Sequence, residues 1–291
     1  MTQQIPVDAA SVLADEAPDG TLIAAADIAY QRHVFVNTVM LGRPGQPDWV
    51  LVDAGIPGSA DGIEAAATKR FGQGRPRAIV MTHGHFDHVG ALETLAGRWQ
   101  VPVYAHPLER PYLDGTAAYP KADPGAGGGL MALLSPLYPR SPVNVGQWLH
   151  DLPADGGVPE LPGWRWVHTP GHSVGHVSLW RERDRALVVG DAFVTVAGES
   201  AYATATQDPE MHGPPRYFTH DWQAAERSVA ALAALEPEIA VTGHGRALHG
   251  GSMRAALHQL SQRFAEVAVP QDGKYAANPQ RAEDGSAYKP A

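Results

Sequence analysis

The chain has 291 residues, 44% of them hydrophobic and 18% charged, which is enough apolar material to bury a core without requiring a second domain. Acidic residues outnumber basic ones by 31 to 22, for a net charge of −9, and no block of Lys and Arg is present, so nucleic acid is not an expected partner. Cysteine is absent, which excludes disulfides, iron–sulfur clusters, thiolate metal sites and a cysteine nucleophile. Any metal must therefore be held by His and carboxylate side chains.

The amino-terminal segment does not have the pattern of a secretory signal. It lacks a basic stretch followed by an apolar stretch, and no run of eighteen apolar residues occurs further along the chain. We therefore expect a cytoplasmic protein with no membrane partner.

Short apolar runs bounded by Gly, Pro or Asp recur along the chain and predict buried strands. In chain order they are HVFVNTVML, WVLVDAG, AIVMTHG, VPVYAH, WRWVHTPG, HVSLWRE, ALVVGDA and EIAVTGHG. Between them, apolar residues at helical spacing predict helices near residues 63–71, 89–95, 225–235 and 253–264. Strands that alternate with helices indicate an α/β fold, which we expect to form a single domain over residues 1–291.

Two segments interrupt this alternation, at about residues 107–162 and 201–222. The first is rich in Gly and Pro with one short helix candidate at 130–134, and the second places aromatic residues and histidines beside a Pro pair. Long insertions of this kind form pocket walls or serve packing and oligomerisation, including a homodimer, and the sequence leaves these alternatives open. From about residue 270 the composition predicts a poorly ordered tail.

Histidine is concentrated after the predicted strand at residues 78–81. Within the six positions 83–88 the chain has four candidate ligands: His83, His85, Asp87 and His88. Alternation along an extended chain would point the first three to one side, and a turn at Gly84 would let His88 join them. Four such side chains crowded together without a metal would leave polar groups unpaired, so the pattern indicates a metal site.

Three further candidate ligands each follow an apolar run and have a neighbouring glycine. These are His172 in TPGHSVGH, Asp191 in VVGDA and His244 in VTGHG. The glycine permits the tight turn that points a short side chain into a shared site. Each motif alone is also compatible with a turn histidine or a strand cap, but the set is more specific than its parts.

These motifs resemble those of the metallo-β-lactamase-fold hydrolases in residue type and order. The matching segments are THGHFDH at 82–88, TPGHSVGH at 169–176, VGDA at 189–192 and GHG at 243–245, preceded by LVDAG at 51–55. The resemblance extends over about residues 33–250. It implies an αββα sandwich of the metallo-β-lactamase type with a binuclear metal centre at one sheet edge.

The resemblance also implies roles for individual residues. His83, His85 and His172 would hold one metal, Asp87, His88 and His244 would hold the other, and Asp191 would bridge the two ions. Asp53 matches an acidic residue that orients a ligand histidine, although a loop-capping role is the alternative. His176 resembles a ligand in chemistry but is interpreted as supporting the ligands or capping a strand, because seven residues already complete two sites.

The implied cofactors are two divalent ions, with Zn²⁺ expected and Fe, Mn or Co also compatible with nitrogen and oxygen ligands. Asp87 and Asp191 would belong to the catalytic centre, where a hydroxide bridging the metals attacks the substrate. Asp191 stands where the best-known binuclear β-lactamases have Cys, which favours the glyoxalase II-like and lactonase-like branch. The expected substrate is therefore a small-molecule lactone, ester or thioester.

Other functions stay open from the sequence. A mononuclear iron persulfide dioxygenase resembles the same motif set, and phosphodiesterases and β-lactamase-like hydrolases share the fold. A non-catalytic scaffold would have lost ligands, whereas all seven are present. Tyr202, Tyr217 and His220 are candidate substrate contacts, with packing roles as the alternative.

Overall fold

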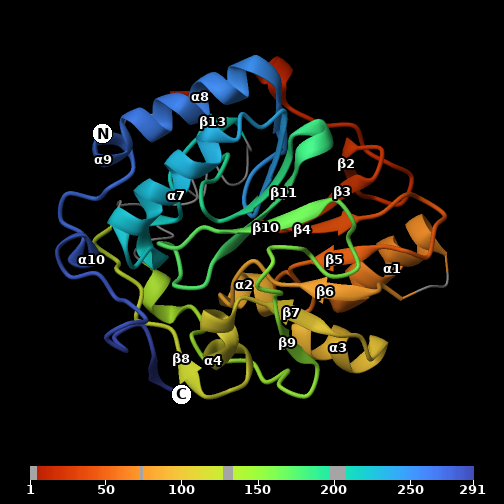
Figure 1. Ribbon diagram of the computed structural model, residues 1–291, viewed down its shortest axis with the longest axis horizontal. Helices are drawn as coiled ribbons and strands as arrows, with labels where there is room; N and C mark the ends of the chain where they lie inside the picture. The colour runs from red at the N-terminus through yellow and green to blue at the C-terminus, as the bar shows by residue number, and fades with distance from the viewer. Residues whose placement is uncertain (1–4, 73–74, 127–133, 197–207) are drawn as a thin grey trace.

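The computed structural model describes residues 5–72, 75–126, 134–196 and 208–291 and contains two large β-sheets (Figure 1). The first sheet has the order β2 (Leu22–Ala25), β3 (Ile28–His33), β4 (Val36–Leu41), β5 (Val50–Val52), β6 (Ala78–Val80), β7 (Val103–Ala105) and β9 (Leu149–Asp151). The second has the order β10 (Trp164–His168), β11 (Val177–Arg181), β12 (Ala186–Gly190), β14 (Ile239–Thr242) and β15 (Leu248–His249). All eight predicted apolar runs contain strands of these two sheets.

The two sheets pack face to face and each carries helices on its outer face. Alternate residues of β5 show why: Val50 and Val52 pack in the core between the sheets, whereas Leu51 packs outward against helices. The outer helices of the first sheet are α1 (Ala60–Phe71) and α3 (Leu92–Trp99), and those of the second are α7 (Trp222–Ala234) and α8 (Gly250–Gln262) (Figure 1). The predicted α/β sandwich of four layers is confirmed.

Each sheet contains a parallel pair of neighbouring strands that is followed by polar residues of the candidate site. β5 pairs with β6 in the first sheet, and β12 pairs with β14 in the second. Asp53 and His83 follow the first pair, and Asp191 and His244 follow the second. Because the carboxyl ends of parallel strands lie at the same edge of a sheet, both sheets present polar side chains at corresponding edges.

The structure contains a hairpin where the sequence predicted one strand. The run from His33 to Leu41 reverses direction at Val34, whose φ of 61° lies in the left-handed region, so β3 and β4 pair antiparallel. The β-branched Val34 concealed this turn because such residues seldom adopt positive φ. The strands β2 and β9 were also not predicted, since neither lies within one of the eight apolar runs.

The segment from about residue 270, which we expected to be poorly ordered, is packed against the rest of the protein. It contains a short helix, α10 (Lys274–Ala277), and a strand, β16 (Lys289–Pro290), that pairs with β8 (Ala117–Ala118). Tyr275 and Ala287 are buried, and the Tyr288 hydroxyl donates to the carbonyl of Leu108. Composition was misleading here because a few buried side chains and backbone hydrogen bonds suffice to dock a polar segment.

Two other expectations concern parts of the chain that the structure describes only partly. Most of the helix candidate at 130–134, and Tyr202 in the second insertion, lie outside the described residues. Within the described ranges, no helix is both long and apolar enough to cross a membrane.

Gly90 illustrates how tightly the first sheet and its helices meet. It follows the short helix α2 (Phe86–Val89), and a Cβ atom there would lie 2.2 Å from backbone atoms of Ile56 and Pro57. We expect Gly90→Ala to lower the free energy of unfolding by about 1–3 kcal/mol, as overpacking does. Gly251→Ala on α8 meets nothing within 4 Å and should change stability by less than about 1 kcal/mol. Urea unfolding of both variants tests this, and equal stabilities would contradict it.

Candidate metal centre

Four candidate ligands lie in the loop after β6 and in the short helix α2 that follows it. His83 and His85 belong to the connecting loop, and the extended backbone of His85 precedes the first turn of α2. Asp87 and His88 lie within that turn. All four side chains are buried, so the loop and helix direct them to the interior rather than to solvent.

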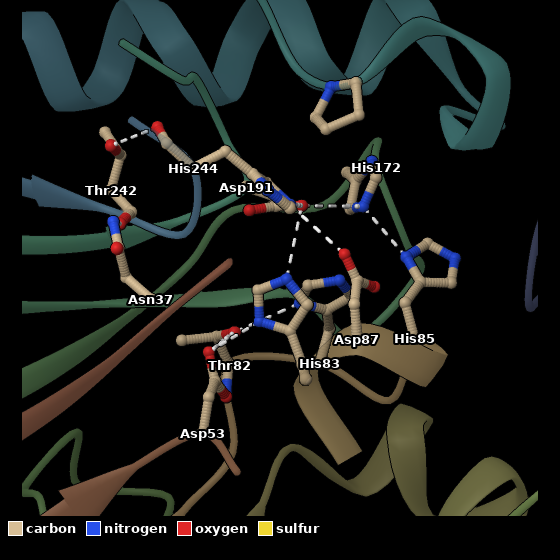
Figure 2. Close-up of polar contacts among 12 residues, drawn as sticks. Asn37, Asp53, Thr82, His83, His85, Asp87, His172, Asp191, Thr242 and His244 are labelled. Atoms are coloured by element: carbon tan, nitrogen blue, oxygen red, sulfur yellow. Dashed lines mark hydrogen bonds and ion pairs between the residues drawn. The ribbon is translucent and has the colours of Figure 1, made fainter. Parts of the chain in front are cut away.

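The second sheet supplies the other three candidate ligands. His172 lies in the loop between β10 and β11, Asp191 directly follows β12, and His244 follows β14. Figure 2 shows the side chains from both sheets pointing toward one another. His172 and Asp191 are buried, and the His244 side chain is 12% exposed.

The seven side chains form three groups that could each hold a metal ion. In each group the ligand atoms lie within 4.8 Å of one another: His83, His85 and His172; Asp87, His88 and His244; and His83, His88 and Asp191. The first two groups coincide with the two ligand sets that the family resemblance implies. The third group links the two sets through Asp191.

Asp191 lies between the two sets. Its Oδ2 atom is 3.4 Å from Nε2 of His172 in the first set, and 3.4 Å from Nε2 of His88 and 3.1 Å from Nε2 of His244 in the second. Asp87 Oδ2 lies 3.4 Å from His244 Nε2. One carboxylate oxygen thus faces histidines of both sets, which is the arrangement that a bridging ligand requires.

The surrounding protein holds four of the histidines by their Nδ1 atoms. Nδ1 of His83 donates to the Thr82 hydroxyl, Nδ1 of His172 to the Thr219 hydroxyl and Nδ1 of His244 to the carbonyl of Phe35. Nδ1 of His88 donates to Asp53. A neutral imidazole that donates from Nδ1 has its lone pair on Nε2, so each of these rings is prepared to bind a metal through Nε2.

Asp53 supports both ends of the loop that carries the first four ligands. Its Oδ1 accepts the Thr82 backbone N–H at 2.8 Å, and its Oδ2 accepts the Thr82 hydroxyl at 2.7 Å and His88 Nδ1 at 2.8 Å. The Thr82 hydroxyl therefore accepts from His83. One buried carboxylate thus accepts from His88 directly and connects to His83 through the Thr82 hydroxyl, and the supporting role of Asp53 stays a prediction.

Several buried atoms in the cluster have no hydrogen-bond partner among the described residues. They are Nε2 of His83, of His85 and of His88, and Oδ1 of Asp191. His88 Nε2 does lie 3.4 Å from Asp191 Oδ2. Unpaired buried polar groups are costly, and native proteins rarely retain them without a reason. Divalent metal ions would satisfy these atoms, so the donor set fits metal.

Burial and neighbouring charges set the protonation of the cluster. Burial lowers the pKa of His83, His85 and His172 well below the usual range, and neighbouring histidines lower it further. Burial opposes ionisation of Asp191, but His244 and His88 beside it hold its pKa well below the usual range. Burial opposes protonation of His88 and His244, but Asp191 beside them raises the pKa of both. Three of the imidazoles and the Asp191 carboxylate are thus in the forms that bind metals, and a bound cation would have to displace the proton from the other two.

His176 supports Asp191 without facing the cluster as a ligand. Its Nε2 accepts the backbone N–H of Asp191 at 2.8 Å, and its Nδ1 contacts the Thr169 hydroxyl at 2.8 Å. Burial lowers the pKa of His176 to about 3, so the ring is neutral and can accept. Both ring nitrogens are therefore occupied by protein groups, and the supporting role of His176 stays a prediction.

Glu109 connects the two ligand-bearing loops and was not singled out from the sequence. Its Oε2 accepts the backbone N–H of Gly84, between His83 and His85, and the Tyr119 hydroxyl. Its Oε1 accepts the Ser173 hydroxyl and the Gly175 N–H, both at 2.8 Å, beside His172. Burial raises the pKa of Glu109, and these four donors oppose that shift. No motif marks Glu109, because its partners are distant in sequence.

Asn37 performs a similar task between the two sheets. Its Nδ2 donates to the carbonyls of Thr242 and Gly245 at 2.9 and 2.7 Å, and its backbone N–H donates to Gly243 (Figure 2). These bonds hold the loop of His244 against β4. Asn37 was also not predicted, because it lies within an apolar run.

The predicted substrate contacts lie near the cluster in different ways. Tyr217 is buried and its ring centroid lies 4.9 Å from that of Phe218, which itself stacks on His85 at 5.0 Å. The buried His220 ring lies 6.2 Å from His85 and 4.7 Å from Tyr275. Tyr217 therefore belongs to an aromatic cluster beside the ligands, whereas the His220 ring lies closer to Tyr275 of the carboxyl-terminal segment than to His85.

The sequence matches a family model described as the metallo-beta-lactamase superfamily over residues 13–244. Among curated proteins, it is 46% identical over 233 residues to the probable metallo-hydrolase YflN of Bacillus subtilis, covering 79% of this chain and 88% of that protein. It is 30% identical to the probable metallo-hydrolase YybB of the same organism, covering 68% and 76%.

Solved structures of low sequence identity share the fold. A beta-lactamase domain protein from Burkholderia ambifaria superposes with a TM-score of 0.58 at 20% identity, covering 89% of this chain and 80% of that chain. The MIM-2 metallo-beta-lactamase superposes with a TM-score of 0.57 at 20% identity, covering 89% and 94%.

Replacing Asp53 tests whether it orients the histidines. In Asp53→Asn, an amide donor would face one of the groups that now donate to the carboxylate, so we expect metal affinity to fall about 10- to 100-fold. Competition with a chromophoric chelator measures this. Asp48→Asn, which alters the exposed pair with Arg77, should bind metal as the unmodified protein does. An unchanged affinity in Asp53→Asn would contradict the orienting role.

A second variant tests the connection through Glu109. Glu109→Gln keeps the shape but places an amide donor against groups that donate, so we expect the free energy of unfolding to fall by about 2 kcal/mol and metal to be released faster to a chelator. The exposed Glu226→Gln should change neither. If Glu109→Gln matched that control in both measurements, the carboxylate would not be bracing the two loops.

Proposed function

The chain belongs to the metallo-beta-lactamase superfamily and is a metallo-hydrolase, and on that premise we propose that it hydrolyses a small-molecule ester, lactone or thioester with two bound divalent ions. His83, His85 and His172 would hold one ion, and Asp87, His88 and His244 the other. Asp191 would contact both ions.

One observation carries this proposal: buried ligand atoms from both sheets converge in three groups, and some of these atoms have no hydrogen-bond partner among the described residues. Without a bound metal, the burial of these polar groups would carry a free-energy cost that no hydrogen bond offsets. The cluster contains only nitrogen and oxygen donors, which suits zinc and also other divalent ions. Zinc is the metal that we propose.

Two bound divalent ions would lower the pKa of water to supply a nucleophile at neutral pH, and would polarise the acyl oxygen of the substrate. The protein itself contributes orientation. Asp53 and Thr82 hold two histidine rings, and His176 holds the backbone of Asp191. Because these partners are buried and hydrogen-bonded, we expect little reorganisation when ligands bind.

An aromatic wall beside the cluster supports a substrate with an apolar or aryl group. Phe218 stacks on His85, and the half-buried Phe86 stacks on Tyr138 with ring centroids 5.4 Å apart. Tyr217 and Ala122 complete this cluster. Aromatic faces bind apolar groups well and can position an acyl or aryl moiety next to the proposed metal ligands.

Elemental analysis combined with ligand variants tests the proposal. Protein purified without added metal is expected to contain two zinc ions per chain and to hydrolyse members of a panel of phenyl esters, lactones and thioesters. Asp191→Ala and His172→Ala should each lose metal and activity while the far-ultraviolet circular dichroism stays unchanged, because each removes a ligand from the cluster. His258→Ala, on the exposed side of α8, should retain both.

Other outcomes would redirect the assignment. A single iron per chain, with oxygen consumption in the presence of a persulfide, would replace hydrolysis with oxygenation. Full turnover by Asp191→Ala would show that the reaction does not use this cluster.

A further inference from the structure

A pocket of about 490 Å³ is lined by residues outside the proposed metal ligands, most of them basic. Lys121, Arg140, Lys274, Tyr275, Lys289 and Pro290 surround it. The whole chain contains four lysines, and three of them meet here. In a protein of net charge −9, this concentrates positive charge at one place.

Segments that are distant in sequence form this lysine pocket. Lys121 and Arg140 lie in the first insertion, Lys121 just after β8, and Lys274 and Lys289 come from the carboxyl-terminal segment. The pairing of β16 with β8 and the hydrogen bond from Tyr275 to the carbonyl of Lys121 hold these segments together.

None of the four cations has a carboxylate partner among the described residues. The Lys274 ammonium donates to the carbonyls of Lys121 and Ala122, that of Lys289 to the amide oxygen of Gln280, and the Arg140 guanidinium to the carbonyl of Tyr119. Elsewhere, arginines such as Arg181 and Arg254 pair with Asp and Glu.

One acidic residue lies close to the pocket, and its hydrogen bonds go to backbone groups. Asp123 accepts the backbone N–H of Lys274 at 2.7 Å and that of Gly125 at 3.2 Å. Burial lowers the pKa of Lys274, Asp123 opposes this and the neighbouring Lys121 adds to it. The positive charges of the pocket are therefore offset only in part.

The pocket also has an apolar component. The Lys274 ammonium lies 4.4 Å from the centre of the Tyr275 ring, and Pro290 lines the same space. Cationic groups arranged around an aromatic ring and aliphatic lysine stems suit a ligand that combines an anionic group with an apolar body.

We propose that the lysine pocket binds a small organic oxyanion, a carboxylate or a phosphoryl-type group attached to an apolar or aryl body. The site is separate from the proposed metal centre, since none of the seven candidate ligands lines the pocket. Binding there requires no hydrolysis, so the inference stands independently of the proposed function.

Calorimetric titration of the full-length, metal-loaded protein tests this proposal. Benzoate and phenylphosphonate are the probes, one for each kind of oxyanion, and neutral benzamide is the control for the apolar body. At least one of the two anions should bind more tightly than benzamide, and its binding should weaken as salt is added.

Variants locate the binding. Lys121→Gln and Lys289→Gln each remove one positive charge but leave a polar side chain, and each should weaken anion binding about fivefold, as the loss of one nearby charge predicts. Lys69→Gln removes the one lysine outside the pocket, on the exposed face of α1, and should bind as the unmodified protein does.

Two results would overturn the proposal. One is equal binding of both anions and benzamide. The other is anion binding that is unaffected by Lys121→Gln and Lys289→Gln but abolished by His172→Ala, because that pattern would place the anion at the metal centre.

Discussion

The buried carboxylate of Asp53 is the interaction on which the candidate metal centre depends. It terminates β5 with a φ of 60°, and its two oxygens accept the Thr82 N–H, the Thr82 hydroxyl and His88 Nδ1. Because a carboxylate only accepts, these contacts determine which nitrogen of His88 and, through Thr82, of His83 carries the proton. Asp53 follows β5, the parallel neighbour of β6. Through it, β5 positions the segment after β6 that supplies four proposed ligands.

The other proposed ligands require a second set of constraints, because they come from a different sheet. Asn37 ties the loop of His244 to the first sheet, and Glu109 ties the loop of His172 to the loop of His83 and His85. Both side chains are buried and bond to backbone groups, so their geometry is shared by whole loops. The cluster consequently lies where loops of the two sheets meet, and these hydrogen bonds connect those loops.

The carboxyl-terminal segment gives the molecule a second polar region of opposite character. Around the proposed metal ligands the structure gathers histidines and carboxylates, whereas in the lysine pocket it gathers cations around Tyr275. His220 lies between the two regions, and Lys274 and Lys289 lower its pKa further after burial has lowered it. The packed tail is therefore part of the electrostatic surroundings of the proposed active site and not an appendage.

The sequence by itself determined the alternation of strands and helices and the candidate ligands of the proposed metal centre, because apolar periodicity and short motifs are local properties. It could not identify the hairpin at Val34, the packed tail, Asn37, Glu109 or the convergence of three lysines. Each of these depends on which distant segments meet, and a buried polar side chain shows its partner only after the chain has folded. Short sequence motifs therefore identified the proposed ligands. Only the tertiary structure showed which buried side chains orient the ligand loops and that the lysine pocket exists.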